Sequence, residues 1–245
     1  MKFALIIAVS SVILISYANA GTGDDNDATS PEVGVEWVTE YSFPHSPLPN
    51  SDDSAKAFYN GLGNAGWTRR FDKGNGDTKE AHFEYNGQDS TYIDGVDIAW
   101  YQGHGTKSRL ELSTYWKWVG FSNEIEWGDH DLEWIALHSC HSTEEPSNFK
   151  GSHYGLNGVH LICGFKTAAL NCVDGGNFAN RLLNGEKVRH AWRHAIDDTH
   201  GSGYTVRIIG ENSACGNDHI WGEGSVIADP TVDSGYYMWT YSCSD

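Results

Sequence analysis

The chain has 245 residues and a formal net charge of −17, so acidic side chains greatly outnumber basic ones. Proteins that bind a nucleic-acid backbone present basic stripes, and this charge therefore excludes nucleic acid as an expected partner. Ten Trp, twelve Tyr and nine Phe supply enough large apolar groups to exclude a mostly disordered chain.

The first twenty residues have the three-part layout of a secretory signal peptide. Lys2 supplies the positive start, residues 3–15 are almost continuously apolar, and residues 18–20 read Ala-Asn-Ala, a small-residue cleavage signal. The apolar run is too short to span a bilayer comfortably, and we expect no membrane partner. The mature chain is expected to be secreted or extracytoplasmic. Residues 21–32 are polar and acidic, which predicts a disordered tail before one domain over 33–245.

Strand and helix patterns alternate along the remaining chain. Short apolar runs bounded by turn residues are typical of buried parallel strands, and apolar residues three or four apart are typical of helices. This alternation predicts an α/β three-layer sandwich with a mostly parallel central sheet. The expected strands lie over 33–41, 67–71, 97–102, 132–137, 159–165, 205–209 and 236–241, the last at an edge, and the expected helices run through 55–62, 177–183 and 187–198.

Two chemically reactive side chains follow the ends of expected strands. The third strand leads into His104 and Gly105, and the fourth leads into Ser139 and Cys140. Ligand sites in open α/β sheets form at the carboxyl ends of strands, so neighbouring strands would bring His104 and Cys140 to one rim. An imidazole that accepts the thiol proton makes Cys140 a nucleophile for acyl transfer. The N–H groups of Gly105 and Cys140 are the expected oxyanion donors.

These residues resemble the signature of the caspase-like cysteine peptidases, a group that includes caspases, legumain, gingipains and clostripain. The similarity covers the order of elements from about residue 33 to 209, and the identities are confined to His104, Gly105, Ser139 and Cys140. The resemblance implies a caspase-like fold and a secreted endopeptidase that hydrolyses peptide or protein substrates through an acyl-enzyme, without a cofactor. Carried over by residue, His104 is the catalytic histidine, Cys140 the nucleophile and Gly105 an oxyanion donor.

The region around the nucleophile departs from the caspase pattern. Caspases have a Gln before the catalytic cysteine and a Gly shortly after it, whereas this chain reads His138-Ser-Cys-His141. The resemblance therefore implies cysteine chemistry and indicates no substrate preference.

An odd number of cysteines in an exported chain indicates at least one free thiol. The chain has five, and pairing Cys163 with Cys172 and Cys215 with Cys243 would leave Cys140 free to react. Four cysteines allow three connectivities, so this pairing is a hypothesis. A buried, unreactive thiol is the alternative role for Cys140, because Cys is among the most buried residue types.

Metal binding is the main alternative to peptidase chemistry. His138, Cys140 and His141 are close in sequence, and with His104 they would form a zinc shell of imidazoles and thiolate. Alternation along a strand places His138 and Cys140 on one face and leaves His141 beyond the strand end, which does not favour a tetrahedral site.

Two further patterns have metal-binding spacing. His190 and His194 lie four residues apart on one expected helix, a spacing that can bind zinc. Two acidic loops are weak calcium candidates without the EF-hand order: one has Asp72, Asn75, Asp77 and Glu80, and the other has Asp218, Asp229 and Asp233.

Aromatic side chains gather over residues 115–118, and Trp127 and Trp134 follow. If they are exposed, they favour a non-enzymatic extracellular binding or adhesion module, for example one that recognises carbohydrate. Packing in the core is the alternative role of such side chains.

Overall fold

The computed structural model describes residues 30–114, 116–150, 153, 155–232 and 235–244. The expected signal peptide and the expected acidic tail up to residue 29 lie outside these residues. Glu32 already belongs to the first strand and is buried, so regular structure begins one residue before the expected boundary at 33. Within the described ranges, no helix is long and apolar enough to cross a membrane.

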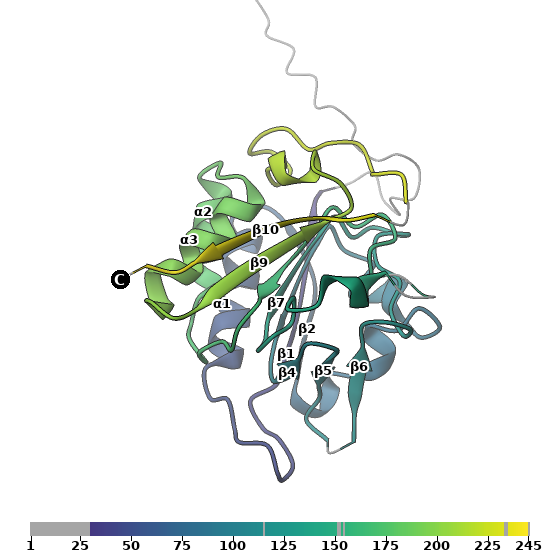
Figure 1. The fold of residues 1–245 in the computed structure, drawn as a ribbon, viewed down its shortest axis with the longest axis vertical. Coiled ribbons are helices and arrows are strands. Elements are labelled where there is room, and N and C mark those ends of the chain that lie inside the picture. Colours follow the sequence, from purple (N-terminus) through teal and green to yellow (C-terminus); the bar gives the residue numbers. More distant parts are fainter. Residues whose placement is uncertain (1–29, 115, 151–152, 154, 233–234, 245) are drawn as a thin grey trace, which may run out of the picture.

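A seven-stranded sheet with the order β10-β9-β8-β7-β3-β1-β2 forms the centre of the structure (Figure 1). Five neighbouring strands, β8, β7, β3, β1 and β2, run parallel to one another. Strand β9 is antiparallel to β8, and β10 is antiparallel to β9. The mixed α/β class and the mostly parallel sheet are confirmed. The strands span Glu32–Trp37 (β1), Thr68–Gly74 (β2), Ile98–Gln102 (β3), Trp134–His138 (β7), Leu161–Phe165 (β8), Thr205–Gly210 (β9) and Tyr237–Ser242 (β10).

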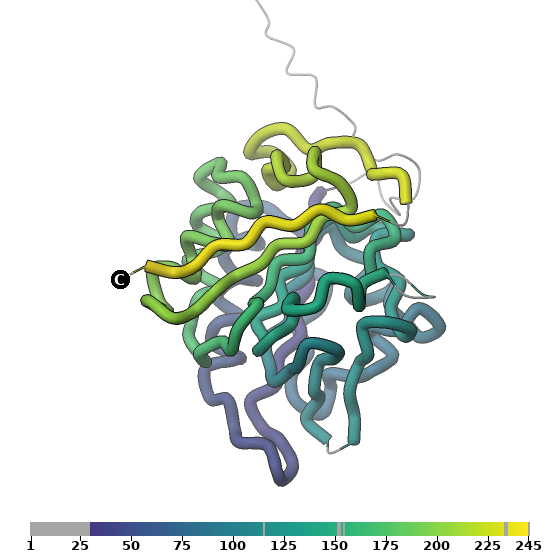
Figure 2. The backbone as a smooth tube through the Cα atoms, in the orientation of Figure 1, coloured from purple at the N-terminus to yellow at the C-terminus, as the bar shows by residue number. Residues whose placement is uncertain are grey.

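Three α-helices, α1 (Ser51–Asn64), α2 (Gly175–Leu183) and α3 (Val188–His200), pack on one face of the sheet (Figure 2). Their buried residues recur three or four positions apart, which turns one apolar stripe of each helix towards the strands. Phe58 of α1 stacks on Trp100 of β3 with ring centroids 5.2 Å apart. Burying one such ring contributes about 1.5–3 kcal/mol.

The opposite face is covered by a small antiparallel sheet and irregular loops. The small sheet contains β4 (Gly105–Thr106), β5 (Arg109–Glu111) and β6 (Trp118–Gly120). Leu110 and Val119 bury their side chains in the same apolar cluster as central-sheet residues. The third layer is therefore not helical. Five 3-10 turns complete the described elements: Asn75–Asp77, Glu80–His82, Asp89–Thr91, Pro146–Phe149 and Cys215–Asn217.

The first strand ends earlier than its alternating pattern predicts. The Val38 N–H still donates to the Gln102 carbonyl of β3, but the N–H groups of Thr39 and Glu40 donate to the side-chain oxygen of Asn75. These bonds lead the chain away from the sheet, so β1 stops at Trp37 instead of residue 41. The side chain of Asn75, distant in sequence, thus ends a strand that the local apolar–polar alternation would extend.

The expected pairing of Cys215 with Cys243 is wrong, because all five cysteines are free. The Cys243 N–H donates to the carbonyl of Tyr204, just before β9 begins, whereas Cys215 follows the end of β9. A six-residue strand spans about 20 Å, far more than the roughly 7 Å between Cα atoms that a disulfide tolerates.

The expected bond between Cys163 and Cys172 is also absent. Cys163 lies in the middle of β8 with its side chain in the core beneath the helices. Cys172 lies beside β3, where its carbonyl accepts a hydrogen bond from Gln102. Strand β7 separates β3 from β8, which places the two cysteines about 10 Å apart in the sheet direction. Burial raises the pKa of the Cys163 thiol well above its ordinary value, which makes it unreactive.

Candidate functional site

The edge of the sheet where the parallel strands end carries the residues that sequence analysis selected. We call it the carboxyl edge, and the opposite edge, where these strands begin, the amino edge. Strands β3 and β7 are neighbours, with Gln102 opposite His138, so their following loops leave the sheet side by side. A Cβ on Gly105 would collide with the Ser139 hydroxyl. The loop carrying His104 therefore touches the loop carrying Cys140.

His104 is held by the loop before α1. Its ring Nε2 lies 2.8 Å from the Ser46 carbonyl oxygen, and its backbone N–H donates to the Tyr41 hydroxyl at 2.7 Å. A carbonyl only accepts, so Nε2 carries the proton and Nδ1 of the neutral ring is free to act as a base. Burial, with a smaller contribution from nearby His45, lowers the pKa of His104, which favours the neutral base.

Cys140 is partly exposed at the same edge. The Ala169 N–H donates to its sulfur at 3.3 Å. His141, at φ 58, turns the chain so that its own N–H donates to the Thr167 carbonyl at 2.8 Å. The backbone N–H of Cys140 makes no hydrogen bond among the described residues, so it is available to an incoming oxygen.

His104 and Cys140 share a rim but do not hydrogen-bond each other within the part of the chain that the structure describes. The imidazole bonds to Ser46 and the sulfur bonds to Ala169. A catalytic pair in a substrate-free enzyme is often further apart than a hydrogen bond and closes in the substrate complex.

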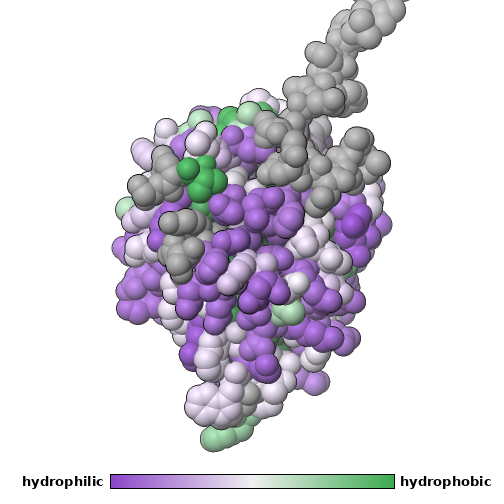
Figure 3. Space-filling view, turned by 90° about the vertical axis from the view of Figure 1, so that its right-hand side faces the viewer, coloured by the Kyte–Doolittle hydropathy of each residue, from purple (hydrophilic) through white to green (hydrophobic). Residues whose placement is uncertain are grey.

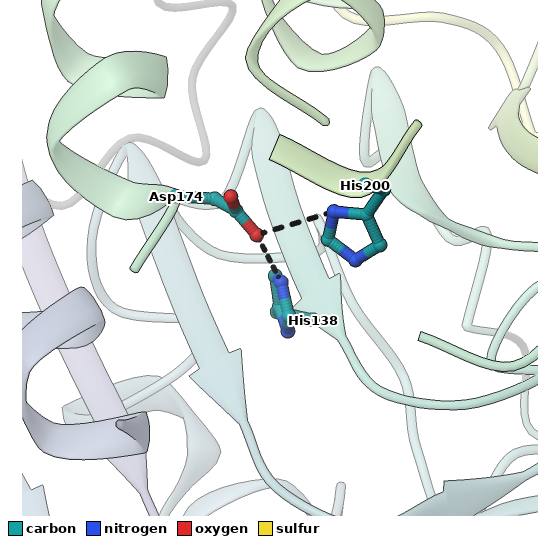
Figure 4. A group of neighbouring side chains, drawn as sticks. All are labelled: His138, Asp174 and His200. Atoms are coloured by element: carbon teal, nitrogen blue, oxygen red, sulfur yellow. Dashed lines mark hydrogen bonds and ion pairs between the residues drawn. The ribbon is translucent and has the colours of Figure 1, made fainter. Parts of the chain in front are cut away.

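A buried group that sequence analysis missed includes His138, two residues before Cys140 (Figure 4). Asp174, just before α2, accepts from His138 with Nε2 and Oδ2 2.5 Å apart, and His200 Nδ1 lies 3.8 Å from the same oxygen. Thr199 donates its hydroxyl proton to the other carboxylate oxygen. We call His138, Asp174, Thr199 and His200 the Asp174 network; the imidazoles and the carboxylate are almost completely buried.

The Asp174 network also holds the loop that contacts the sulfur. The Leu170 N–H donates to His200 Nε2 at 3.1 Å, one residue after the amide that donates to Cys140. Burial, as the main cause, lowers the pKa of His200 to about 4, so the ring is neutral at neutral pH and its Nε2 can accept this bond. Separations of 26 to 62 residues between the network's three elements hid it from sequence patterns.

The alternative zinc shell does not form among the described residues, because its members have separate partners. His138 faces Asp174, His104 faces Ser46 and Cys140 faces Ala169, while His141 Nδ1 lies 2.8 Å from a carboxylate oxygen of Glu144 on the surface. The helical pair belongs to no group of three potential ligands within the described residues, and His194 bonds to Glu186 at 2.8 Å.

The calcium candidates also have other partners. Asp72 accepts from the Trp37 indole, Asn75 accepts from Thr39, and Glu80 pairs with Lys117. These separate contacts do not converge on a common point.

The second calcium candidate surrounds an imidazole. Asp218 and Asp229 flank His160, at 2.7 Å from Nδ1 and 3.5 Å from Nε2 respectively. Burial opposes the charge on His160, but the two carboxylates outweigh it and raise its pKa. Asp233 lies outside the described residues.

The expected aromatic cluster divides between core and surface. Trp127 and Trp134 are buried, whereas Trp116 is 69% exposed at φ 69. Trp118 is half-buried under the guanidinium of Arg109, 4.5 Å from its ring centroid. Among the described residues drawn in Figure 3, hydrophilic groups dominate and apolar ones are scattered.

Replacing Gly105 by Ala is expected to lower stability by about 1–3 kcal/mol, because the added methyl overlaps the Ser139 hydroxyl. Thermal unfolding measures the loss. Gly76→Ala is the matched control, since nothing lies within 4 Å of its Cβ. Adding Ser139→Ala to Gly105→Ala should restore most of the melting temperature, because the nearest Ser139 atom is then Cβ at 3.3 Å. No loss in Gly105→Ala would contradict the contact.

The fold and the rim define a mixed α/β protein with a free thiol and an imidazole on neighbouring strand ends. A family model described as Domain of unknown function (DUF6345) matches residues 35–242, most of the chain, and the chain therefore belongs to this family. The matched span contains His104, Cys140 and the whole Asp174 network. A comparison with curated proteins finds no match.

Proposed function

We propose that the chain is a secreted cysteine endopeptidase of the caspase-like type, with Cys140 as nucleophile and His104 as general base. The observation that carries the proposal is the position of both residues at the ends of adjacent parallel strands, with their loops in contact. The His-Gly and Ser-Cys strand ends and the mostly parallel sheet agree with the resemblance seen in the sequence.

The proposed reaction begins with transfer of the thiol proton of Cys140 to Nδ1 of His104. The thiolate attacks the peptide carbonyl carbon, and the oxygen takes up the negative charge while the Cys140 and Gly105 N–H groups donate to it. The imidazolium returns the proton to the departing amine, which leaves an acyl-enzyme. Water then attacks the acyl carbon while His104 accepts its proton, and the acid is released as the imidazolium returns that proton to the departing sulfur of Cys140.

Ser46 acts in this proposal as the residue that orients the base. Its carbonyl holds the Nε2 proton of His104, which directs the unprotonated Nδ1 away from Ser46. A backbone carbonyl thus takes the place that a carboxylate has in a Ser-His-Asp triad. The Asp174 network holds the loop whose Ala169 amide donates to the Cys140 sulfur, and it makes no hydrogen bond with His104 among the described residues.

Labelling by a panel of peptidyl electrophiles tests the proposal. A mass-spectrometric digest should find the adduct on Cys140, while the buried Cys163, Cys215 and Cys243 stay unmodified in the folded protein. The pKa of His104 is lowered, so the ring stays neutral below the ordinary histidine value of about 6.5. Labelling should therefore fall only as the pH drops below about 6.5 and the base becomes protonated. Labelling of Cys172 as fast as Cys140 would contradict the proposal.

The exposed Trp116 favours one alternative, a binding module on the same fold. A folded protein whose Cys140 resists every electrophile, yet binds a glycan array in a way that Trp116→Ala abolishes, would replace the peptidase proposal with this one. Exposed aromatic side chains of this kind stack on apolar faces of ligands.

A further inference from the structure

Three potential metal ligands converge at the amino edge, on the loops that lead into β3 and β7. Asp94, Asp129 and His130 each offer one ligand atom, and these atoms all lie within 4.8 Å of one another. Asp94 is fully buried, His130 is half-buried and Asp129 is exposed, so the group opens from a buried floor to the surface. We call these residues the amino-edge cluster.

Asp94 has a carboxylate oxygen without a partner. Its Oδ1 accepts from the Gly128 N–H at 2.5 Å, whereas Oδ2 is buried and has no hydrogen-bond partner among the described residues. Asp129 offers a carboxylate oxygen within 4.8 Å of the ligand atom of Asp94. Two carboxylates this close, one of them buried, require either a shared proton or a cation between them.

The backbone that carries these ligands is held in place by its own contacts. The Asp94 carbonyl accepts from the Asp131 N–H at 3.0 Å, and the Asp94 N–H donates to the Asp89 carbonyl at 2.9 Å. Gly128 has a φ of 91 and lies so close to Val159 that no side chain fits there. A preformed backbone of this kind lowers the cost of gathering ligands around an ion.

The two outer ligands have no competing partners. Within the described ranges, no hydrogen bond or ion pair ties the Asp129 carboxylate or the His130 imidazole to a residue outside the amino-edge cluster. The histidines of the Asp174 network, in contrast, are bonded to Asp174 and to the Leu170 amide. The amino-edge cluster is therefore the better of the two candidate metal sites.

We propose that Asp94, Asp129 and His130 bind a divalent transition-metal ion of the zinc class. An imidazole with two carboxylates suits zinc, whereas calcium takes oxygen ligands almost exclusively. Three protein ligands leave a fourth position for water. The ion would join the two loops that enter β3 and β7. Because the five residues of β7 span roughly 16 Å, the site is separate from Cys140 and independent of the peptidase proposal.

Zinc titration of chelator-stripped full-length protein tests this site, with bound metal counted after equilibrium dialysis and the melting temperature measured in parallel. Wild type should bind one zinc more than His130→Ala or Asp129→Asn, and zinc at a hundredfold excess over its Kd should raise its melting temperature by roughly 5 °C. Both variants should lose that rise. His190→Ala is the matched control, since it removes a surface histidine from the other zinc-like spacing, and it should behave as wild type.

Several results would contradict the proposed zinc site. Equal zinc content in wild type and His130→Ala would place the metal elsewhere, and saturation by CaCl2 but not by ZnCl2 would refute the assigned class. If the carboxylates share only a proton, Asp94→Asn should raise the melting temperature and zinc should have no effect on wild type. Loss of zinc binding in His130→Ala with full electrophile labelling at Cys140 would support the site and leave the peptidase proposal standing.

Discussion

Cys140→Ala is expected to reduce peptide turnover to background, because it removes the proposed nucleophile. His104→Ala should slow turnover by about 10²–10⁴-fold, the usual contribution of a general base. Both residues are only partly buried, so neither substitution should shift the melting temperature appreciably. Turnover is measured by mass spectrometry of a peptide library incubated with each variant.

Two comparisons make the result specific to the proposed pair. The double variant should be no slower than Cys140→Ala alone, because residues that act as a unit are not additive. His141→Ala is the matched control, since this neighbouring imidazole contacts Glu144 at the surface and should not affect the rate. Full activity in Cys140→Ala, or equal losses in His104→Ala and His141→Ala, would reject the dyad.

Asp174→Ala is expected to lower stability by about 3 kcal/mol, because it leaves the buried His138 N–H without its acceptor and removes one acceptor of the Thr199 hydroxyl. For a chain of this size the melting temperature should fall by roughly 6–12 °C. Asp174 makes no side-chain capping bond to α2, so the loss reports on the network and not on the helix end. Differential scanning calorimetry measures the change.

Two further variants distinguish the loss of the network's hydrogen bonds from the mere loss of a negative charge. Asp174→Asn keeps one oxygen for the His138 N–H and should lose less than Asp174→Ala. Asp198→Ala on α3 breaks only a half-exposed ion pair with Arg181 on α2 and should change stability by less than about 1 kcal/mol. A melting temperature for Asp174→Ala close to that of Asp198→Ala would show that the network contributes little. Because His200 also binds the Leu170 amide, Asp174→Ala should slow labelling of Cys140 as well.

Sequence patterns predicted the main elements because those patterns are local. The runs that became β3, β7 and β8 are buried over their whole length and mostly apolar, as expected of parallel strands covered on both faces. The same logic found His104 and Cys140, since a reactive residue directly after a buried strand reaches the carboxyl edge once the sheet is parallel. The small strands β4, β5 and β6 escaped detection because runs of two or three residues carry too little pattern.

The sequence by itself determined the α/β class, the positions of the long strands and the two residues at the carboxyl edge. Only the tertiary structure decided which distant side chains meet. Asp174 and His200 join His138, and Asp94 meets His130, because strand pairing and helix packing bring together segments that no periodicity links. The disulfide expectation failed for the same reason. The number of cysteines says nothing about the distances between them, and the length of β9 separates Cys243, near the start of this strand, from Cys215, after its end.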